Sequence, residues 1–202
     1  MIKILSQAFI LLLLASPSWG KTVLVLGDSL SAGYGISVED GWVNLLQENL
    51  NDTSSSQHNI INASVTGETT GGGLARLPAL LAKHQPDIVI VELGGNDGLR
   101  GHAIKVMQKN ILSIVQLSRD AGAQTLLLGM QIPPNYGRRY TQQFASAYNK
   151  IAQAQSLPFV PFFLDKVALK KAWMQADGIH PNEKAQAQLL ANVLPHLSPI
   201  LQ

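Results

Sequence analysis

The chain has 202 residues, 46% of them hydrophobic and 14% charged, which is the composition of one globular domain and excludes a disordered protein. Its formal net charge of +2 argues against nucleic-acid binding, because that function needs a basic face to meet the phosphates. The absence of cysteine excludes disulfides, thiolate metal sites and a cysteine nucleophile.

The first twenty residues have the pattern of a signal peptide. Lys3 supplies a positive start, residues 4–15 are almost entirely apolar, and the run Ser18-Trp19-Gly20 puts small residues ahead of a cut before Lys21. An apolar run of about a dozen residues is too short to cross ~30 Å of hydrocarbon, so we expect no stable membrane anchor. We predict a leader over residues 1–20 and a periplasmic or secreted mature protein.

After the leader, apolar strand patterns alternate with helical patterns. In chain order, strands are expected at 22–26, 58–63, 87–93, 124–130 and 159–163. Helices are expected at 41–50, 74–84, 103–121, 141–155 and 183–197, with loops at 51–57 and 133–139. Strands separated by helices of this length imply right-handed crossovers and a parallel sheet. We predict an α/β protein with a single three-layer α/β/α domain over residues 21–202.

The first polar cluster directly follows the first predicted strand. Gly27 permits a tight turn, and Ser29 would lie near the start of a helix, where free backbone N–H groups favour developing negative charge. This pattern is typical of a nucleophile, but Asp28 or Ser29 as a simple helix cap explains it equally well in isolation. The usual G-x-S-x-G elbow of α/β-hydrolases is absent.

Two glycine-containing clusters follow the next two predicted strands. Gly67 would let its backbone N–H approach a ligand, although an ordinary turn glycine is the simpler interpretation. Asn96, within Gly94-Gly95-Asn96-Asp97-Gly98, offers a neutral N–H donor at a strand end, although turn chemistry favours the same residues. A phosphate-binding loop fails on spacing, because neither G-x-G-x-x-G nor G-K-[ST] is present.

The fourth cluster, Asp177 to Pro181, precedes the last predicted helix. An aspartate three residues before a histidine can place its carboxylate against the imidazole Nδ1–H, which leaves Nε2 of His180 free to accept a proton. A surface histidine at a helix start is the alternative. A metal site would need further ligands nearby, so we expect neither a metal nor another cofactor.

Taken together, the four clusters supply a nucleophile, a base, an orienting carboxylate and oxyanion donors, which is the set of groups that acyl transfer requires. Because ligands of open parallel sheets bind beyond the carboxyl ends of the strands, three of these clusters should meet at one edge.

The same clusters, in this order, resemble the conserved blocks of the SGNH (GDSL) hydrolase family. Ser29 lies in GDSLS, Gly67 is the family glycine, Asn96 lies in GGND and His180 lies in DGIHP. Longer segments, including GDSLSAGYG, VELGGNDGLRG and WMQADGIHPN, resemble the periplasmic multifunctional members that act as thioesterases, arylesterases and lysophospholipases. The resemblance covers residues 21–197.

This resemblance implies a catalytic triad of Ser29, Asp177 and His180 and an oxyanion hole formed by Ser29, Gly67 and Asn96. It also implies a flavodoxin-like fold with a five-stranded parallel sheet. The expected substrate is a small acyl ester, thioester or lysophospholipid, and we expect a monomer without a nucleic-acid partner.

An acyl groove is expected between the 98–102 loop and the 130–140 loop, an expectation that rests partly on the resemblance. Its candidate substrate-binding residues are Gly98, Leu99, Met130, Ile132, Pro134 and Tyr136. The segment MQIPPN at 130–135 is shorter than in a better-known member, so no preference for acyl-chain length is carried over.

Two other functions compete with broad acyl-ester hydrolysis. A carbohydrate deacetylase or an acyltransferase would use the same fold and the same nucleophile. A non-catalytic periplasmic binding protein is the other alternative, since fold does not fix function. The presence of a nucleophile, a base and two oxyanion positions argues against the binding protein.

Overall fold

The computed structural model describes residues 20–54 and 56–202, so the predicted leader, apart from Gly20, lies outside the described residues. One sheet contains β1 (Thr22–Gly27), β2 (Asn59–Asn62), β3 (Ile88–Glu92), β4 (Gln124–Leu128) and β5 (Phe159–Val160). All its pairings are parallel, and the strand order is β2-β1-β3-β4-β5. This is the flavodoxin-like order of doubly wound sheets, so the predicted fold is confirmed.

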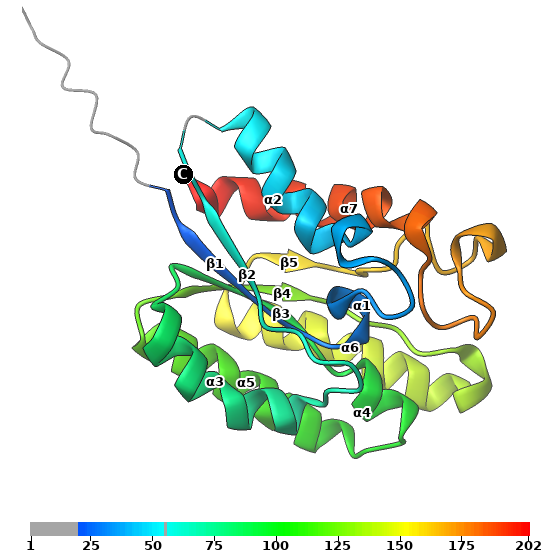
Figure 1. Cartoon of the computed structure of the whole chain (residues 1–202). Coiled ribbons are helices and arrows are strands. Elements are labelled where there is room, and N and C mark those ends of the chain that lie inside the picture. Colours follow the sequence, from blue (N-terminus) through cyan, green and yellow to red (C-terminus); the bar gives the residue numbers. More distant parts are fainter. Residues whose placement is uncertain (1–19, 55) are drawn as a thin grey trace, which may run out of the picture.

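Helices cover both faces of this sheet. They are α1 (Ser29–Ala32), α2 (Trp42–Thr53), α3 (Thr70–His84), α4 (Gly95–Leu99), α5 (Ile104–Asp120), α6 (Arg138–Gln155) and α7 (Gln186–Leu201). Figure 1 shows α2 and α7 on one face and α3, α5 and α6 on the other, with α1 and α4 near one end of the strands. None of the helices within the described ranges is long and apolar enough to span a bilayer.

The central strands form the middle of the hydrophobic core. The side chains of residues 23–26 in β1 and of 88–91 in β3 are completely buried, because helices cover both faces of the sheet. This explains why both strands read as continuous apolar runs and not as an alternating pattern. On one covering layer, Trp42 and Leu46 of α2 are also completely buried.

The strand order places a topological switch point between β1 and β3. From β1 the chain proceeds to β2 on one side of the sheet, and β3 then pairs on the other side of β1. Connections that leave neighbouring strands in opposite directions open a crevice beyond their carboxyl ends, where ligands of such folds bind. The segments that follow Gly27, Asn62 and Glu92 all begin at this edge.

Several element boundaries differ from the predicted ones. Helix α2 continues to Thr53, and α6 begins at Arg138, so parts of both predicted loops are helical. Helix α3 begins at Thr70 and not at residue 74, because the Thr69 side chain accepts the N–H of Gly72 at 3.2 Å and caps the helix. Strand β5 ends at Val160 and not at residue 163.

Candidate active site

The turn after β1 places Ser29 at the first position of α1. Asp28 is the N-cap of this helix, and its Oδ1 accepts the backbone N–H of Leu30 at 3.0 Å. Gly33, with φ +74°, ends the helix after one turn in the left-handed conformation that glycine favours. The Ser29 side chain is held at a strand–helix junction and is only 7% exposed.

The three predicted triad residues lie together. Nε2 of His180 is 2.9 Å from Oγ of Ser29, and Nδ1 of His180 is 2.6 Å from Oδ2 of Asp177. The other carboxylate oxygen of Asp177 accepts the backbone N–H groups of Ile179 at 2.9 Å and His180 at 3.0 Å. Asp177 therefore holds the local turn and the imidazole ring at the same time.

These contacts determine the ionisation of Asp177. Partial burial alone would raise the pKa of its carboxyl group, but the hydrogen bonds from His180 and Ile179 outweigh burial and lower the pKa to about 2. The carboxylate is consequently charged throughout the neutral range. When the imidazole is neutral and its Nδ1–H donates to this carboxylate, Nε2 is left as an acceptor that faces Ser29.

The loop that carries His180 is fixed by contacts that the sequence did not suggest. Nε2 of Gln175 donates to the carbonyl of Tyr34 at 2.7 Å, and the backbone N–H of Gln175 donates to the carbonyl of His180 at 2.8 Å. The rings of Tyr34 and His180 lie 4.6 Å apart between centroids. No local motif distinguishes Tyr34, because its contacts with Gln175 and His180 join segments far apart in the sequence.

The two further candidate oxyanion residues follow β2 and β3. Gly67 has φ +76°, a conformation that side chains rarely adopt. Asn96 lies in the short helix α4, and its Nδ2 donates to Oδ2 of Asp28 at 3.0 Å. The structure thus joins the segment of Asn96 directly to the turn of the candidate nucleophile.

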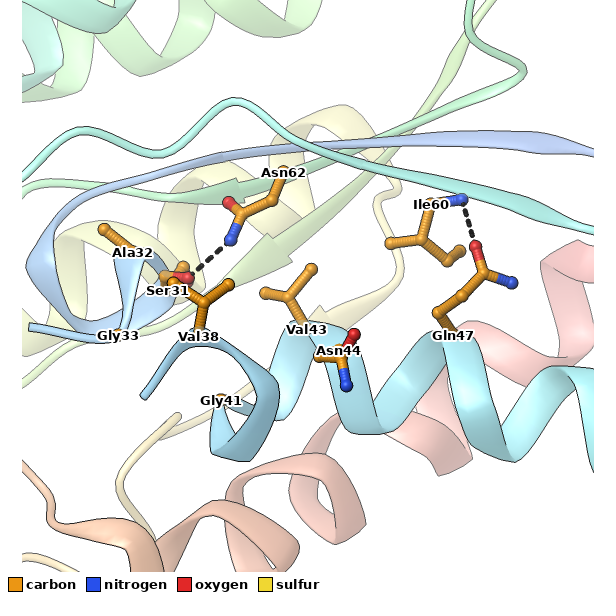
Figure 2. A pocket seen from close by; sticks show the side chains of 10 residues that line it. All are labelled: Ser31, Ala32, Gly33, Val38, Gly41, Val43, Asn44, Gln47, Ile60 and Asn62. Carbon is orange, nitrogen blue, oxygen red and sulfur yellow. Dashed lines mark hydrogen bonds between the residues drawn. The ribbon is translucent and has the colours of Figure 1, made fainter. Parts of the chain in front are cut away.

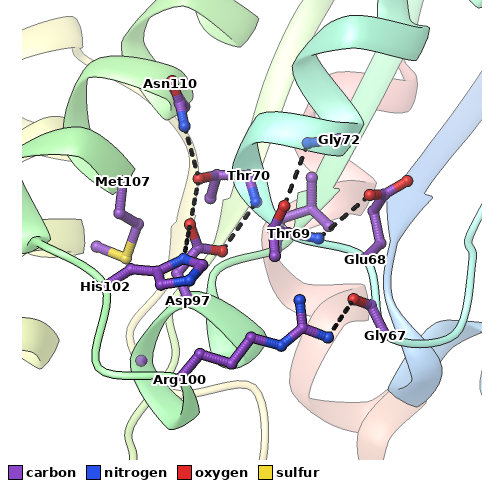
Figure 3. Close-up of polar contacts among 12 residues, drawn as sticks. Gly67, Glu68, Thr69, Thr70, Gly72, Asp97, Arg100, His102, Met107 and Asn110 are labelled. Carbon is purple, nitrogen blue, oxygen red and sulfur yellow. Dashed lines mark hydrogen bonds and ion pairs between the residues drawn. The ribbon is translucent and has the colours of Figure 1, made fainter.

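Three hydrogen bonds connect the segment of Gly67 and Thr70 to the α4 segment (Figure 3). The buried Asp97 accepts the backbone N–H of Thr70 at 2.9 Å and its hydroxyl at 2.7 Å. Nη2 of Arg100 donates to the carbonyl of Gly67 at 3.0 Å. These contacts fix the segments of Gly67 and Asn96 relative to each other.

A second carboxyl group lies below the turn. Glu92 at the end of β3 is completely buried, and its Oε2 accepts the backbone N–H of Asp28 at 3.2 Å and the hydroxyl of Ser31 at 2.7 Å. Burial raises the pKa of Glu92 well above its usual range, and the neighbouring Asp28 raises it further. The start of α1 is thereby fixed to β3.

The six candidate acyl-binding residues are not equivalent. Met130 and Ile132 are buried, Leu99 is half-buried, and Pro134 and Tyr136 are exposed. The two loops do meet: the hydroxyl of Tyr136 donates to the carbonyl of Leu99 at 3.0 Å, and a Cβ on Gly98 would lie 2.7 Å from Cγ2 of Ile132. The two loops therefore lie in contact with each other, as predicted.

A separate pocket lies behind α1 (Figure 2). Residues of the α1–α2 region and of β2 line it, and Nδ2 of Asn62 donates to the carbonyl of Ser31 within it at 2.8 Å. Neither Ser29 nor His180 contributes to its wall. Among the described residues no group of three or more histidine, aspartate or glutamate side chains could hold a metal ion.

Comparisons with known proteins identify the family of this chain. Residues 25–188 match the GDSL-like Lipase/Acylhydrolase family. The chain is 49% identical to Esterase TesA of Pseudomonas aeruginosa, with 98% of each chain covered. It is 45% identical to Thioesterase 1/protease 1/lysophospholipase L1 of Escherichia coli K12, covering 96% of this chain and 91% of the relative.

A solved structure extends the likeness to three dimensions. The psychrotrophic esterase EstA of a Pseudoalteromonas species, inhibited by monoethylphosphonate, is 44% identical and superposes with a TM-score of 0.84. The match covers 89% of this chain and 97% of that one. From the family match over most of its length and from these relatives, the chain belongs to the GDSL-like lipase/acylhydrolase family and is an acyl hydrolase.

Proposed function

We propose that this enzyme hydrolyses small acyl esters and thioesters through Ser29, His180 and Asp177. The observation that carries the proposal is the continuous hydrogen-bonded chain from the Ser29 hydroxyl through His180 to Asp177, with distances of 2.9 and 2.6 Å. A nucleophile, a base and a group that orients the base, within hydrogen-bond reach, are the defining geometry of nucleophilic acyl transfer.

The reaction proceeds in two halves. Oγ of Ser29 attacks the acyl carbonyl carbon while Nε2 of His180 takes the hydroxyl proton, and the tetrahedral intermediate expels the alcohol or thiol, which receives that proton. A water then attacks the acyl-enzyme with His180 again as base, and release of the acid restores the Ser29 hydroxyl. Asp177 stabilises the imidazolium in both halves without taking a proton.

The negative oxygen of each intermediate needs donors that are already in place. We assign this role to the backbone N–H groups of Ser29 and Gly67 and to Nδ2 of Asn96. All three residues belong to segments that begin at the same edge of the sheet, and the contacts of Arg100 and Asp97 hold two of those segments together. Preorganised donors of this kind usually provide the largest single stabilisation of an acyl-transfer transition state.

The substrate class follows from the relatives. The names of the two curated relatives cover esterase, thioesterase and lysophospholipase activities, so we propose a monomeric enzyme that acts on the same range. The phosphonate inhibition of the Pseudoalteromonas esterase supports a serine nucleophile, since phosphonates trap such groups as covalent adducts. A deacetylase or acyltransferase remains the alternative, and neither would show broad hydrolysis of p-nitrophenyl esters.

Replacement of the nucleophile tests the proposal most simply. Ser29→Ala should lower kcat for p-nitrophenyl esters by about a million-fold, because the remaining groups cannot form an acyl-enzyme. Ser64→Ala is the matched control, since the Ser64 hydroxyl lies near the same turn and makes no hydrogen bond to any described residue. Near-normal turnover by folded Ser29→Ala protein would disprove the mechanism.

The Asp177→Asn variant separates a catalytic from a structural role. It should lower kcat by about 10⁴-fold, less than His180→Ala, because the amide cannot stabilise the correct imidazole tautomer. Asp120→Asn, which removes an exposed carboxylate that bonds Gln116, should leave kcat unchanged. A lower melting temperature with normal kcat would instead make Asp177 a turn residue only.

The effect of Asp177→Asn on the melting temperature should depend on pH. Because folding lowers the pKa of Asp177 from 3.8 to about 2, its ionised carboxylate stabilises the fold above about pH 4, and that contribution disappears as the pH falls through 2. The difference in melting temperature between the wild type and Asp177→Asn should therefore shrink as the pH falls below 4. A difference that grows on acidification would contradict this assignment.

The acyl groove is proposed between the 98–102 and 130–140 loops. Leu99→Ala should lower kcat/KM for an octanoyl ester about 10-fold more than for acetate, because only the longer chain loses apolar contact, at roughly 0.8 kcal/mol per CH₂. Leu112→Ala on α5, where the side chain is 38% exposed, is the matched control. An equal loss on both esters would place the chain elsewhere.

We propose export to the periplasm or beyond, with the leader removed before Lys21. The backbone N–H of Lys21 donates to Nδ1 of His58 at 3.1 Å, and its Nζ donates to the carbonyls of Ile200 and Gln202, each at 2.8 Å. The first residue after the proposed cut is thus tied to the domain, which supports a mature chain that starts there.

Intact-mass measurement of the exported protein should give a chain that begins at Lys21. Gly20→Leu should block the cut, because signal peptidase needs a small side chain at that position. Exported protein that still begins at Met1 would refute the leader.

A further inference from the structure

The amide of Asn96 makes a single hydrogen bond to a described side chain, to Asp28. Its Nδ2 lies 3.0 Å from Oδ2 of Asp28, and the other oxygen of that carboxylate accepts the N–H of Leu30 at 3.0 Å. Asp28 directly precedes Ser29 in the chain. One carboxylate therefore contacts both the helix that carries the candidate nucleophile and the candidate oxyanion donor.

The chemistry of the partner decides which end of the amide faces the turn. An ionised carboxylate only accepts hydrogen bonds, whereas an amide has a donating nitrogen and an accepting oxygen. With Asp28 as partner, Asn96 must direct its nitrogen toward the turn of Ser29, and its oxygen is turned away. A flipped amide would offer an oxygen to the oxyanion and would repel it.

The carboxylate of Asp28 is itself held firmly. It is 2% exposed, its own backbone N–H donates to Glu92, and a Cβ on Gly95 would lie only 3.4 Å from Oδ2. Burial outweighs the hydrogen bonds from the Leu30 N–H and the Asn96 amide, so the pKa of Asp28 is raised to about 6. At pH 8 the carboxyl group is therefore ionised, which is the form that accepts the Asn96 N–H.

We infer that Asp28 is a positioning residue for catalysis: its carboxylate accepts one N–H of the Asn96 amide and so leaves the second N–H of the same nitrogen for the oxyanion. This role rests on the proposed function, because it acts only through the assigned donor. Asp28 touches no reacting atom, and it contributes by supplying the orientation in advance, so that no reorganisation is needed in the transition state.

The competing explanation is that Asp28 merely caps α1. Asp28→Ser distinguishes the two roles, because serine is also a good N-cap and can still accept the Leu30 N–H, but its shorter side chain cannot reach Asn96. Asp28→Asn keeps the shape of the side chain, but its amide nitrogen would face either the Leu30 N–H or the Asn96 amide, where a hydrogen-bond acceptor is needed. If capping is the whole role, Asp28→Ser keeps the wild-type kcat.

A double-mutant cycle at pH 8 tests the coupling. We would measure kcat and KM with p-nitrophenyl butyrate for the wild type, Asn96→Ala, Asp28→Ser and the double variant, and melting temperatures for all four. Asn96→Ala should lose about 100- to 1,000-fold in kcat with little change in KM. Asp28→Ser should lose about 10- to 100-fold in kcat alone, and less than about 3-fold when Asn96 is already alanine.

Each outcome has one meaning. Non-additive losses support the positioning role, even if Asp28→Ser also lowers the melting temperature. If Asp28→Ser lowers kcat as much in the Asn96→Ala background as it does in the wild type, Asp28 acts through Ser29 or through the fold, and the inference is wrong. A normal kcat for Asn96→Ala overturns the oxyanion assignment itself, so failure of the proposed function is distinguishable from failure of this inference.

Discussion

Parallel pairing of β1 with both β2 and β3 is the constraint on which the site depends. Because all three strands point the same way, the segments that follow them start at one edge, and they carry Ser29, Gly67 and Asn96. His180, the proposed base, lies in a fourth segment before α7, where its ring contacts Tyr34 and its Nε2 lies 2.9 Å from Oγ of Ser29.

The polar groups beneath the site form a layered arrangement. Glu92 fixes the backbone of Asp28, and Asp28 bonds both Leu30 and Asn96. Asp97, next to Asn96, holds the start of α3 through Thr70. Buried carboxyl groups are costly unless hydrogen bonds compensate for their desolvation, and these hydrogen bonds provide such compensation for Asp28 and Asp97.

The sequence predicts the parts of this architecture that depend on local pattern. The five strands and the long helices follow from periodicity, since strands covered on both faces are continuously apolar and surface helices are amphipathic. An aspartate three residues before a histidine can interact with it within one turn, and the Asp177 carboxylate does lie 2.6 Å from Nδ1 of His180. The spacing did not indicate that Ser29 lies beside them, and that expectation came from the family resemblance.

Other features could not be predicted, because they depend on tertiary contacts. Helices α1 and α4 are too short to give a periodic signal, and their glycines and polar residues read as turns. Gly73 lies in the first turns of α3, where a Cβ would come within 2.4 Å of Leu93, so a residue that weakens helix propensity is needed for close packing. The sequence indicated Asp28 as a possible helix cap, and the structure confirms this. Its contact with Asn96 could not be predicted, because the two residues lie 68 positions apart.

Covalent trapping would identify the side chain that becomes acylated, which we propose is Ser29. The wild-type protein would be treated with a fluorophosphonate, and the adduct would be mapped by peptide mass spectrometry alongside residual esterase activity. We expect one adduct, on Ser29, with loss of activity in proportion to labelling and no adduct in His180→Ala over the same time. Labelling of Ser31 or Ser64 in place of Ser29, or full activity after complete labelling of Ser29, would contradict it.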